Sequence, residues 1–196
     1  MNIMIAIIDI GSGNLQSVRK VLSYLGEESK IVDSPEEISS FERVILPGVG
    51  NFGKVMEGLR SRGFEQPIRD LIKSKVSFLG ICVGLQILFE TSEESPASKG
   101  LGIFKGKVVK FQQGKIPQIG WNLIVPRKTD LFKQGYVYYV NSYYVQPEDS
   151  ALISATSDYF GDFTGAIQKN NLTAVQFHPE KSGQYGIDFY RRWVAC

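Results

Sequence analysis

Apolar residues in the first half of the chain alternate between two kinds of pattern. Continuous apolar runs are typical of buried strands. These runs cover residues 3–10, 29–34, 43–47 and 76–81. Between them, apolar positions recur at helical spacing. The helices predicted in this way cover 15–26, a stretch through Met56 and Leu59, 68–75 and 84–91. This alternation predicts βαβ units and a parallel sheet with helices on both faces.

The second half changes character and becomes rich in β-branched and aromatic residues, broken by Gly, Pro, Asn and Asp. Its strand-like runs cover 106–111, 121–125, 136–145, 151–156, 164–169 and 173–177. They predict a mixed or antiparallel extension of the same sheet, closed by a helix from about Tyr185 to Trp193. No repeat or linker divides the chain. We therefore expect one α/β domain over 1–196: an open, mostly parallel sheet flanked by helices, with this extension.

Composition narrows the class of protein without indicating its chemistry. A hydrophobic content of 43%, a charged content of 21% and a net charge of +2 argue against a nucleic-acid or membrane partner. The opening "MNIMIAIIDI" has neither the basic leader of a signal peptide nor the length of a membrane span. Two cysteines without metal-ligand spacing and a single histidine predict a cytoplasmic protein with no metal and no cofactor.

The strongest chemical signal is "GICVG", in which two glycines bracket Cys82 at a predicted strand-to-helix junction. This is the G-x-nucleophile-x-G form of a nucleophile elbow, where glycine allows a tight turn and close packing. At such an elbow the helix N-terminus favours a thiolate, and the backbone N–H of Val83 supplies half of an oxyanion hole. Cys82 is therefore a candidate nucleophile. The alternative is a small, buried structural cysteine.

A second glycine-rich stretch, "VILPGVGNFG", contains G-x-G-x-x-G after a strand and so resembles a dinucleotide-binding turn. The acidic residue that this interpretation requires at the end of the next strand is missing, since Ile81 and Cys82 stand there and Asp70 comes too early. The segment 47–50 instead predicts a loop that presents peptide N–H groups to an oxyanion beside Cys82. A plain glycine-rich turn is the alternative.

His178 follows the predicted strand 173–177, at the carboxyl-end rim where an open parallel sheet binds its ligands. Pro179 biases His178 toward extended geometry, in which residues i and i+2 project to the same side. Glu180 is therefore expected to approach the imidazole, set its tautomer and leave the other nitrogen free to activate a thiol. Cys82, His178 and Glu180 together form a predicted nucleophile, base and orienting carboxylate.

These residues lie in blocks that resemble a known family. "GICVGLQ" and "QFHPEKS" are similar to the two signatures of class I, triad-type glutamine amidotransferases. More narrowly, "IDIGSGNLQSV", "LPGVGNFG", "GICVGLQILFETSEE", "IGWN", "YVNSYY" and "QFHPEKSG" together resemble the family of glutaminase subunits of imidazole glycerol phosphate synthases. The resemblance runs from Asp9 to about Gly186 and so covers nearly the whole chain.

The resemblance implies that glutamine is hydrolysed to glutamate and ammonia through a γ-glutamyl thioester on Cys82. It implies an oxyanion hole built from backbone N–H groups of Gly48, Val49, Gly50 and Val83, in a loop that reorganises before the hole is complete. Five residues match positions that hold the glutamine: Gly50, Gln86, Glu94, Ser142 and Tyr143. For Glu94, a solvated carboxylate at a helix end is the alternative.

The same resemblance implies a heterodimer with a (βα)₈-barrel cyclase, which uses the ammonia in histidine biosynthesis to form imidazole glycerol phosphate and aminoimidazole carboxamide ribotide. Asn14, Tyr138 and Lys181 match positions that face the cyclase. The chain has Gln118 and Asn141 where the family often has histidine, which puts gating at the interface in doubt but not the glutaminase chemistry. The tyrosines of 136–144 are expected mainly to pack within strands.

Three other functions compete with this hypothesis. An amidotransferase subunit could feed ammonia to a different acceptor, such as a surface-sugar precursor, and only its partner would distinguish it. A cysteine hydrolase or peptidase could use the same elbow, but these usually recruit a histidine soon after the nucleophile, and none lies near Cys82. A silent binding module on the same fold is disfavoured because the Cys, His and Glu are all present.

Overall fold

The computed structural model describes residues 4–74, 76–128 and 130–196. Ile3, at the start of the first predicted strand, and Lys75, at the end of a predicted helix, lie outside the described residues. In the described residues, no helix combines the length and the apolar composition that crossing a membrane requires.

The first half alternates strands and helices, as the apolar pattern predicts. Its elements are β1 Ile5–Ile8, α1 Leu15–Tyr24, β2 Ser29–Val32, a 3₁₀ helix Pro35–Ser40, β3 Arg43–Gly48, α2 Phe52–Ser61, α3 Glu65–Lys73 and β4 Ser77–Cys82. Every side chain of β1 is buried, and so are five of the six in β3 and in β4. This burial explains why these strands are apolar throughout rather than alternating.

The second half adds strands and a closing helix. Its elements are α4 Val83–Gln86, β5 Thr91–Ser92, β6 Gly106–Lys110, β7 Gln118–Pro126, β8 Gly135–Asn141, β9 Tyr143–Pro147, a 3₁₀ helix Ser150–Leu152, β10 Ile153–Asp158, β11 Asp162–Lys169, β12 Leu172–Val175, a 3₁₀ helix Pro179–Lys181 and α5 Gly183–Ala195.

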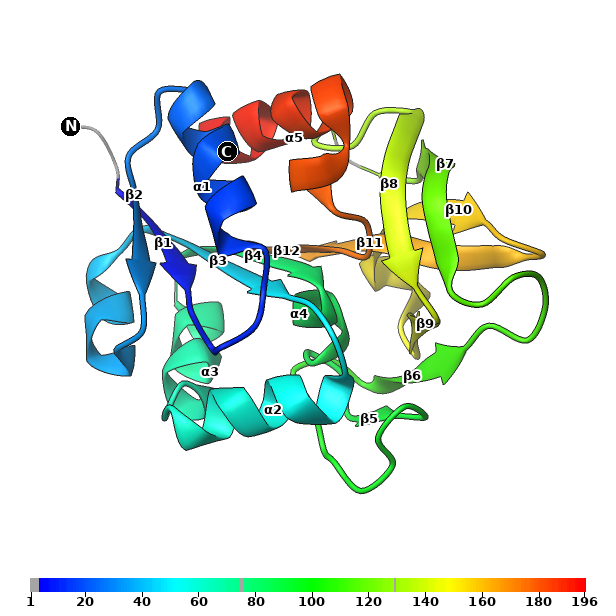
Figure 1. Cartoon of the computed structure of the whole chain (residues 1–196), viewed down its shortest axis with the longest axis horizontal. Coiled ribbons are helices and arrows are strands. Elements are labelled where there is room, and N and C mark those ends of the chain that lie inside the picture. The colour runs from blue at the N-terminus through cyan, green and yellow to red at the C-terminus, as the bar shows by residue number, and fades with distance from the viewer. Residues whose placement is uncertain (1–3, 75, 129) are drawn as a thin grey trace.

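Nine of the described strands form one sheet, in the order β2-β1-β3-β4-β12-β11-β10-β7-β8. The pairs from β2 to β12 are parallel, and those from β12 to β8 are antiparallel. The predicted parallel sheet with an antiparallel extension is thus confirmed. Helices α1 and α5 cover one face, and α2, α3 and α4 lie on the other (Figure 1).

One predicted strand, 136–145, is wrong as a single element. It breaks at Ser142, so that β8 stays in the large sheet while β9 joins β5 and β6 in a separate three-stranded sheet. The break lets Tyr144 pair with Val109 and place its ring 4.8 Å from that of Phe111. Alternation along the strand alone does not reveal that its partners change halfway.

The predicted helix over 84–91 is also wrong in extent, because α4 ends at Gln86. The carbonyl groups that would continue the helix accept bonds from a later loop instead: Ile87 O from Leu101 N at 2.7 Å, and Leu88 O from Ile103 N at 2.8 Å. Leu85, Ile87, Leu88 and Phe89 are fully buried. The segment is therefore apolar because it is surrounded, rather than because it presents one helical face to the core.

Candidate active site

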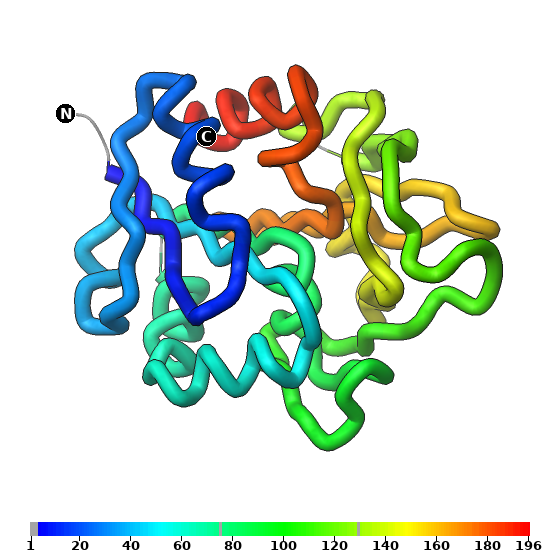
Figure 2. Tube along the Cα trace, viewed as in Figure 1, coloured from blue at the N-terminus to red at the C-terminus, as the bar shows by residue number. Residues whose placement is uncertain are grey.

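Loops that follow neighbouring strands β3, β4 and β12 converge on one cavity of about 560 Å³. Figure 2 shows these cyan, green and orange parts of the chain approaching one another near the middle of the molecule. The cavity is lined by Gly13, Asn14, Val49, Gly50, Cys82, Val83, Gln86, Glu94, Pro117, Val140, Asn141, Ser142, Tyr143, His178 and Lys181. Its size suits a small-molecule ligand.

Cys82 ends β4 in a strained backbone conformation, with φ 55° and ψ −108°, and only 4% of the residue is exposed. A Cβ placed on Gly84 would lie 2.2 Å from Leu46 O, and one on Gly80 would lie 2.7 Å from Gly84 O. The two glycines are therefore required because the elbow packs directly against β3 and against itself.

Cys82 stands at the N-terminus of a helix, as the elbow motif predicts, but this helix is short. Helix α4 has four residues, so few peptide dipoles align behind the sulfur.

The glycine-rich loop lies beside the elbow. Gly48 pairs in register with Cys82, and a Cβ at Gly48 would lie 2.7 Å from Gly84 N. Val49 and Gly50 leave the strand, are exposed and line the cavity, with Gly50 at φ +97°. The loop thus has the proximity and backbone freedom that an oxyanion-binding segment needs.

His178 and Glu180 form a buried pair, with 2.9 Å between Nδ1 and Oε1 and side chains that are 3% and 1% exposed. His178 is extended, as Pro179 predicts, but the expected extended path to Glu180 is wrong. Pro179–Lys181 is a 3₁₀ turn closed by a bond from Lys181 N to His178 O of 3.0 Å, and this turn carries Glu180 to the ring.

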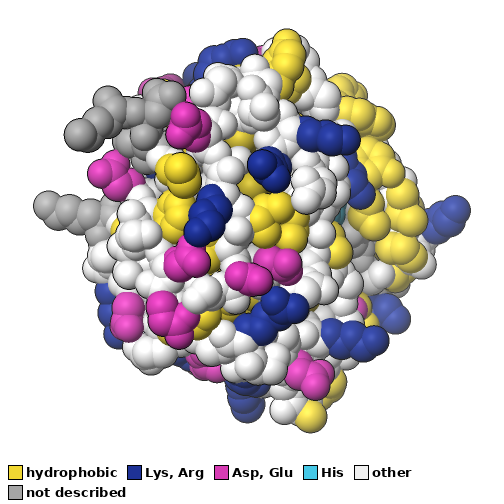
Figure 3. Space-filling view, turned by 60° about the vertical axis from the view of Figure 1, so that its left-hand side comes forward, with side chains coloured by type: hydrophobic (Ala, Val, Ile, Leu, Met, Phe, Trp, Pro, Cys, Tyr) yellow, Lys and Arg dark blue, Asp and Glu magenta, His cyan; other side chains and the backbone are white. Residues whose placement is uncertain are grey.

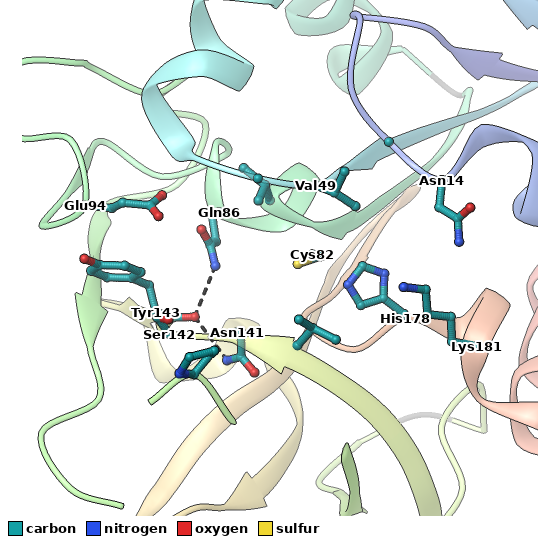
Figure 4. A pocket seen from close by; sticks show the side chains of 15 residues that line it. Asn14, Val49, Cys82, Gln86, Glu94, Asn141, Ser142, Tyr143, His178 and Lys181 are labelled. Carbon is teal, nitrogen blue, oxygen red and sulfur yellow. Dashed lines mark hydrogen bonds between the residues drawn. The ribbon is translucent and has the colours of Figure 1, made fainter. Parts of the chain in front are cut away.

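Cys82 lies beside the imidazole ring (Figure 4). Burial alone lowers the pKa of His178, but the sulfur of Cys82 and the carboxylate of Glu180 outweigh it and raise this pKa to about 10. The ring therefore holds a proton at neutral pH, and Glu180 accepts a hydrogen bond from its Nδ1 and fixes the orientation of the ring.

The backbone of His178 is bonded to β8. His178 N donates to Tyr138 O at 2.9 Å, and the hydroxyl of Ser182 accepts from Tyr138 N at 3.0 Å and donates to His178 O at 2.7 Å. Two hydrogen bonds thus hold the histidine loop to β8, and a third, from Ser182 to His178 O, fixes the loop itself.

Four of the five residues matched to glutamine binding gather on the cavity wall opposite His178 (Figure 4): Gln86, Glu94, Ser142 and Tyr143. Glu94 accepts from Phe52 N at 2.6 Å and so caps α2, which makes it more than a solvated carboxylate. Gln86 donates to Tyr143 O at 3.1 Å, and Ser142 lies next to it at the break between β8 and β9. The wall thus offers a carboxylate, an amide and a hydroxyl to a polar ligand.

Gln176 is absent from the sequence predictions, yet it belongs to the site. It is fully buried, and its amide lies between Gln86 and the sulfur of Cys82. The signal that could have identified it is an amide side chain in the apolar run "TAVQF", two residues before His178.

Of the residues matched to a partner interface, Asn14 and Lys181 line the mouth of the cavity beside His178 (Figure 4), whereas Tyr138 stacks edge-on against Trp121 at 5.9 Å. Gln118 and Asn141 are cross-strand partners on β7 and β8. Asn141 lines the cavity and donates to Tyr143 O at 3.1 Å. In the part of the chain that the structure describes, no cluster of three or more His, Cys, Asp or Glu side chains could hold a metal ion.

The family model of class-I glutamine amidotransferases matches residues 6–192. The chain belongs to this family. Among its relatives are the imidazole glycerol phosphate synthase subunits HisH of Dehalococcoides mccartyi, 45% identical over 97% of this chain and 96% of that protein, and of Chlorobaculum tepidum, 44% identical over 97% and 99%. Within the amidotransferases the chain is therefore of the HisH type.

Solved structures share the fold of this amidotransferase at lower identity. A PurLQS structure from Thermotoga maritima superposes with a TM-score of 0.81 at 16% identity, covering 100% of this chain and 99% of that one. A crystal structure described as a glutamine amidotransferase gives a TM-score of 0.79 at 17% identity, covering 97% of both chains.

The single histidine allows a direct test of its electrostatic environment. We expect His178 to titrate well above 6.5, and Glu180→Gln to lower its pKa, because the substitution removes a group that raises the pKa and leaves the opposing burial in place. The imidazole signal in an NMR pH titration measures both. Asp188→Asn, on the outer part of α5, should leave the midpoint unchanged, and a wild-type midpoint near 6.5 would contradict the expectation.

Proposed function

We propose that this chain is a glutaminase of the HisH type that releases ammonia from glutamine for a partner cyclase in histidine biosynthesis. The observation that carries the proposal is the arrangement of Cys82, His178 and Glu180 on one rim of a small-molecule cavity. Family membership over nearly the whole chain supports it independently. The unpaired cysteines fit the cytoplasmic location in which such a pathway would run.

In the proposed reaction, His178 starts as the imidazolium, with the Cys82 proton already on Nε2, and the thiolate sulfur attacks the side-chain amide carbon of glutamine. The C–N bond then breaks, and the imidazolium gives its proton to the departing nitrogen, which leaves as ammonia. Water attacks the γ-glutamyl thioester and gives a proton to His178. The C–S bond breaks, glutamate leaves, and the thiolate of Cys82 is restored beside the protonated His178. Glu180 holds Nδ1 throughout, so Nε2 faces the sulfur.

The negative oxygen formed in each addition step would bind backbone N–H groups of Val83 and of the loop Gly48–Gly50. Glycine at position 50 leaves this loop free to change its peptide orientation, since no atom lies within 4 Å of its missing Cβ. We infer that the loop is the part of the site on which a partner acts. Gln86, Glu94, Ser142 and Tyr143 would hold the amino-acid end of glutamine on the opposite wall.

The proposed partner is a (βα)₈-barrel cyclase that docks over the cavity mouth, where Asn14 and Lys181 lie, and over Tyr138 on β8. Large apolar side chains are exposed beside this mouth, on the strands β7 and β8: Ile119 is 61% exposed, Trp121 56% and Tyr136 64%. Figure 3 shows hydrophobic side chains gathered on this side of the molecule. Aromatic groups of this kind often anchor interfaces, and Tyr138 is bonded to the His178 backbone.

The function is tested by measuring glutamate formation with and without a barrel cyclase. We expect stimulation by the cyclase, and consumption of the ammonia when the cyclase substrate is added. If the cyclase does not stimulate the reaction and a synthase subunit with a different ammonia acceptor does, the proposed acceptor is wrong. The glutaminase chemistry would still hold.

The docking surface has its own test. Trp121→Ala should weaken binding of the cyclase roughly 30-fold, because an interfacial aromatic anchor contributes about 2 kcal/mol. Isothermal titration calorimetry with the cyclase measures this loss. Tyr24→Ala is the matched control, since Tyr24 is 73% exposed at the far end of α1. Equal affinity of both variants would exclude this surface.

A further inference from the structure

The amide of Gln176 lies where it can act on the sulfur of Cys82. Its Nε2 is 3.6 Å from Cys82 Sγ, within the longer range of hydrogen bonds to sulfur. Gln176 is fully buried and comes directly after β12. This strand pairs with β4, which carries Cys82. Its backbone N–H donates to Gly165 O at 2.9 Å, which anchors the residue to β11.

The orientation of this amide follows from its neighbours. Gln86 Nε2 donates to Tyr143 O, a backbone carbonyl that can only accept, and also to Gln176 Oε1, both at 3.1 Å. With its oxygen taken by Gln86, Gln176 must present its NH₂ group to Cys82. A donor so placed stabilises a negatively charged sulfur more than a neutral one.

We propose that Gln176 is a positioning residue that favours the thiolate of Cys82 and couples the nucleophile to the glutamine-binding wall. The amide N–H bonds to the sulfur, while the amide oxygen fixes Gln86 and, through it, the Tyr143 carbonyl. The proposal deepens the proposed function, since it rests on Cys82 as the nucleophile. It also accounts for a nucleophile at the end of a four-residue helix that supplies little dipole of its own.

Alkylation of the full-length protein by iodoacetamide tests this idea without glutamine or a partner. Peptide mass spectrometry follows Cys82 and the exposed Cys196 separately, so Cys196 is an internal reference. Gln176→Leu should slow alkylation of Cys82 at neutral pH about tenfold and move its pH profile upward, because the thiolate loses a donor. Cys196 should react as in the wild type.

Two further variants separate this effect from damage to the fold. Thr173→Val replaces a buried polar side chain on β12, the strand that leads to Gln176, and should leave the Cys82 profile unchanged. Gln176→Glu keeps the size and the acceptor for Gln86 but places a carboxyl oxygen against the sulfur, so it should slow Cys82 more than Gln176→Leu does. Circular dichroism verifies folding, and unfolding would instead expose Cys82 and make both cysteines react alike.

A wild-type pH profile for Cys82 in folded Gln176→Glu would overturn the proposal, even if Gln176→Leu fails to fold. The alkylation rates do not depend on whether the protein hydrolyses glutamine, so the inference and the proposed function can fail separately. If the Gln176 variants shift the pH profile of Cys82 but the wild type has no glutaminase activity, the proposed function is wrong and the inference holds. If the wild type is an active glutaminase and the Gln176 variants keep the wild-type profile, the inference is wrong and the function holds.

Discussion

Cys82→Ala should abolish glutamine hydrolysis, lowering kcat by at least about 10⁴-fold, because no other group at the cavity can form the thioester. The substitution is nearly isosteric and keeps a Cβ at the same positive φ, so the strain of the elbow is retained. The fold and the cavity should therefore persist, and the loss should appear in kcat with little change in the melting temperature.

Glutamate release in the presence of the cyclase measures this effect, and Cys196→Ala is its control. Cys196 is exposed, and its thiol donates to Arg192 O at 3.2 Å in the last turn of α5. That variant should hydrolyse glutamine at the wild-type rate. Substantial activity in Cys82→Ala would show that another nucleophile or a bound water performs the reaction, and the proposed mechanism would be wrong.

The sequence predicted the parts of the fold that depend on local pattern. Apolar runs and helical spacing identify β1, β3, β4 and α1, because the residues that each element buries are apolar and follow the period of that element. A change of hydrogen-bond partners part-way along a segment leaves no signal in the segment's own sequence. After the break at Ser142, β9 joins another sheet, and α4 stops after one turn because the loop 100–104 bonds to the carbonyl groups of Ile87 and Leu88, which follow the helix.

In the candidate site too, the features set by short sequence motifs could be predicted, and those set by tertiary contacts could not. The elbow glycines and the His178 loop carry their chemistry in short motifs, which is why both could be predicted. Gln176 accepts a hydrogen bond from Gln86, 90 residues away in the chain. An amide in an apolar strand indicates a buried polar role, but its partner depends on the tertiary structure. Similarly, Tyr138 has the pattern of a strand aromatic, and only the structure places its backbone against His178.

The helix α5 supports the His178 loop from behind at Gly186. A Cβ on this glycine would lie 1.8 Å from Pro179 O and 2.8 Å from Pro179 C, distances that no packing tolerates. Pro179 O also accepts from Ser182 N at 3.0 Å, so the carbonyl cannot turn away without opening the 3₁₀ turn. Gly186→Ala must therefore separate α5 from the segment that carries Glu180.

Two effects of opposite sign compete in Gly186→Ala. Helix propensity favours alanine by about 1 kcal/mol in the interior of a helix. Overpacking against a fixed backbone costs about 3 kcal/mol, and here it should prevail, so the free energy of unfolding should fall by about 2 kcal/mol. Displacement of His178 and Glu180 should also lower glutaminase activity by on the order of 100-fold.

Urea unfolding and the cyclase-stimulated glutaminase assay measure the two consequences separately. Gln184→Ala is the matched control, because Gln184 is exposed on the same helix and its side chain donates to the exposed carboxylate of Asp188 at 3.1 Å. It should change stability by less than about 0.5 kcal/mol and leave activity intact. A more stable and fully active Gly186→Ala would mean that propensity prevails and that α5 does not set the position of His178. A destabilised variant with wild-type kcat would place the strain elsewhere in the turn.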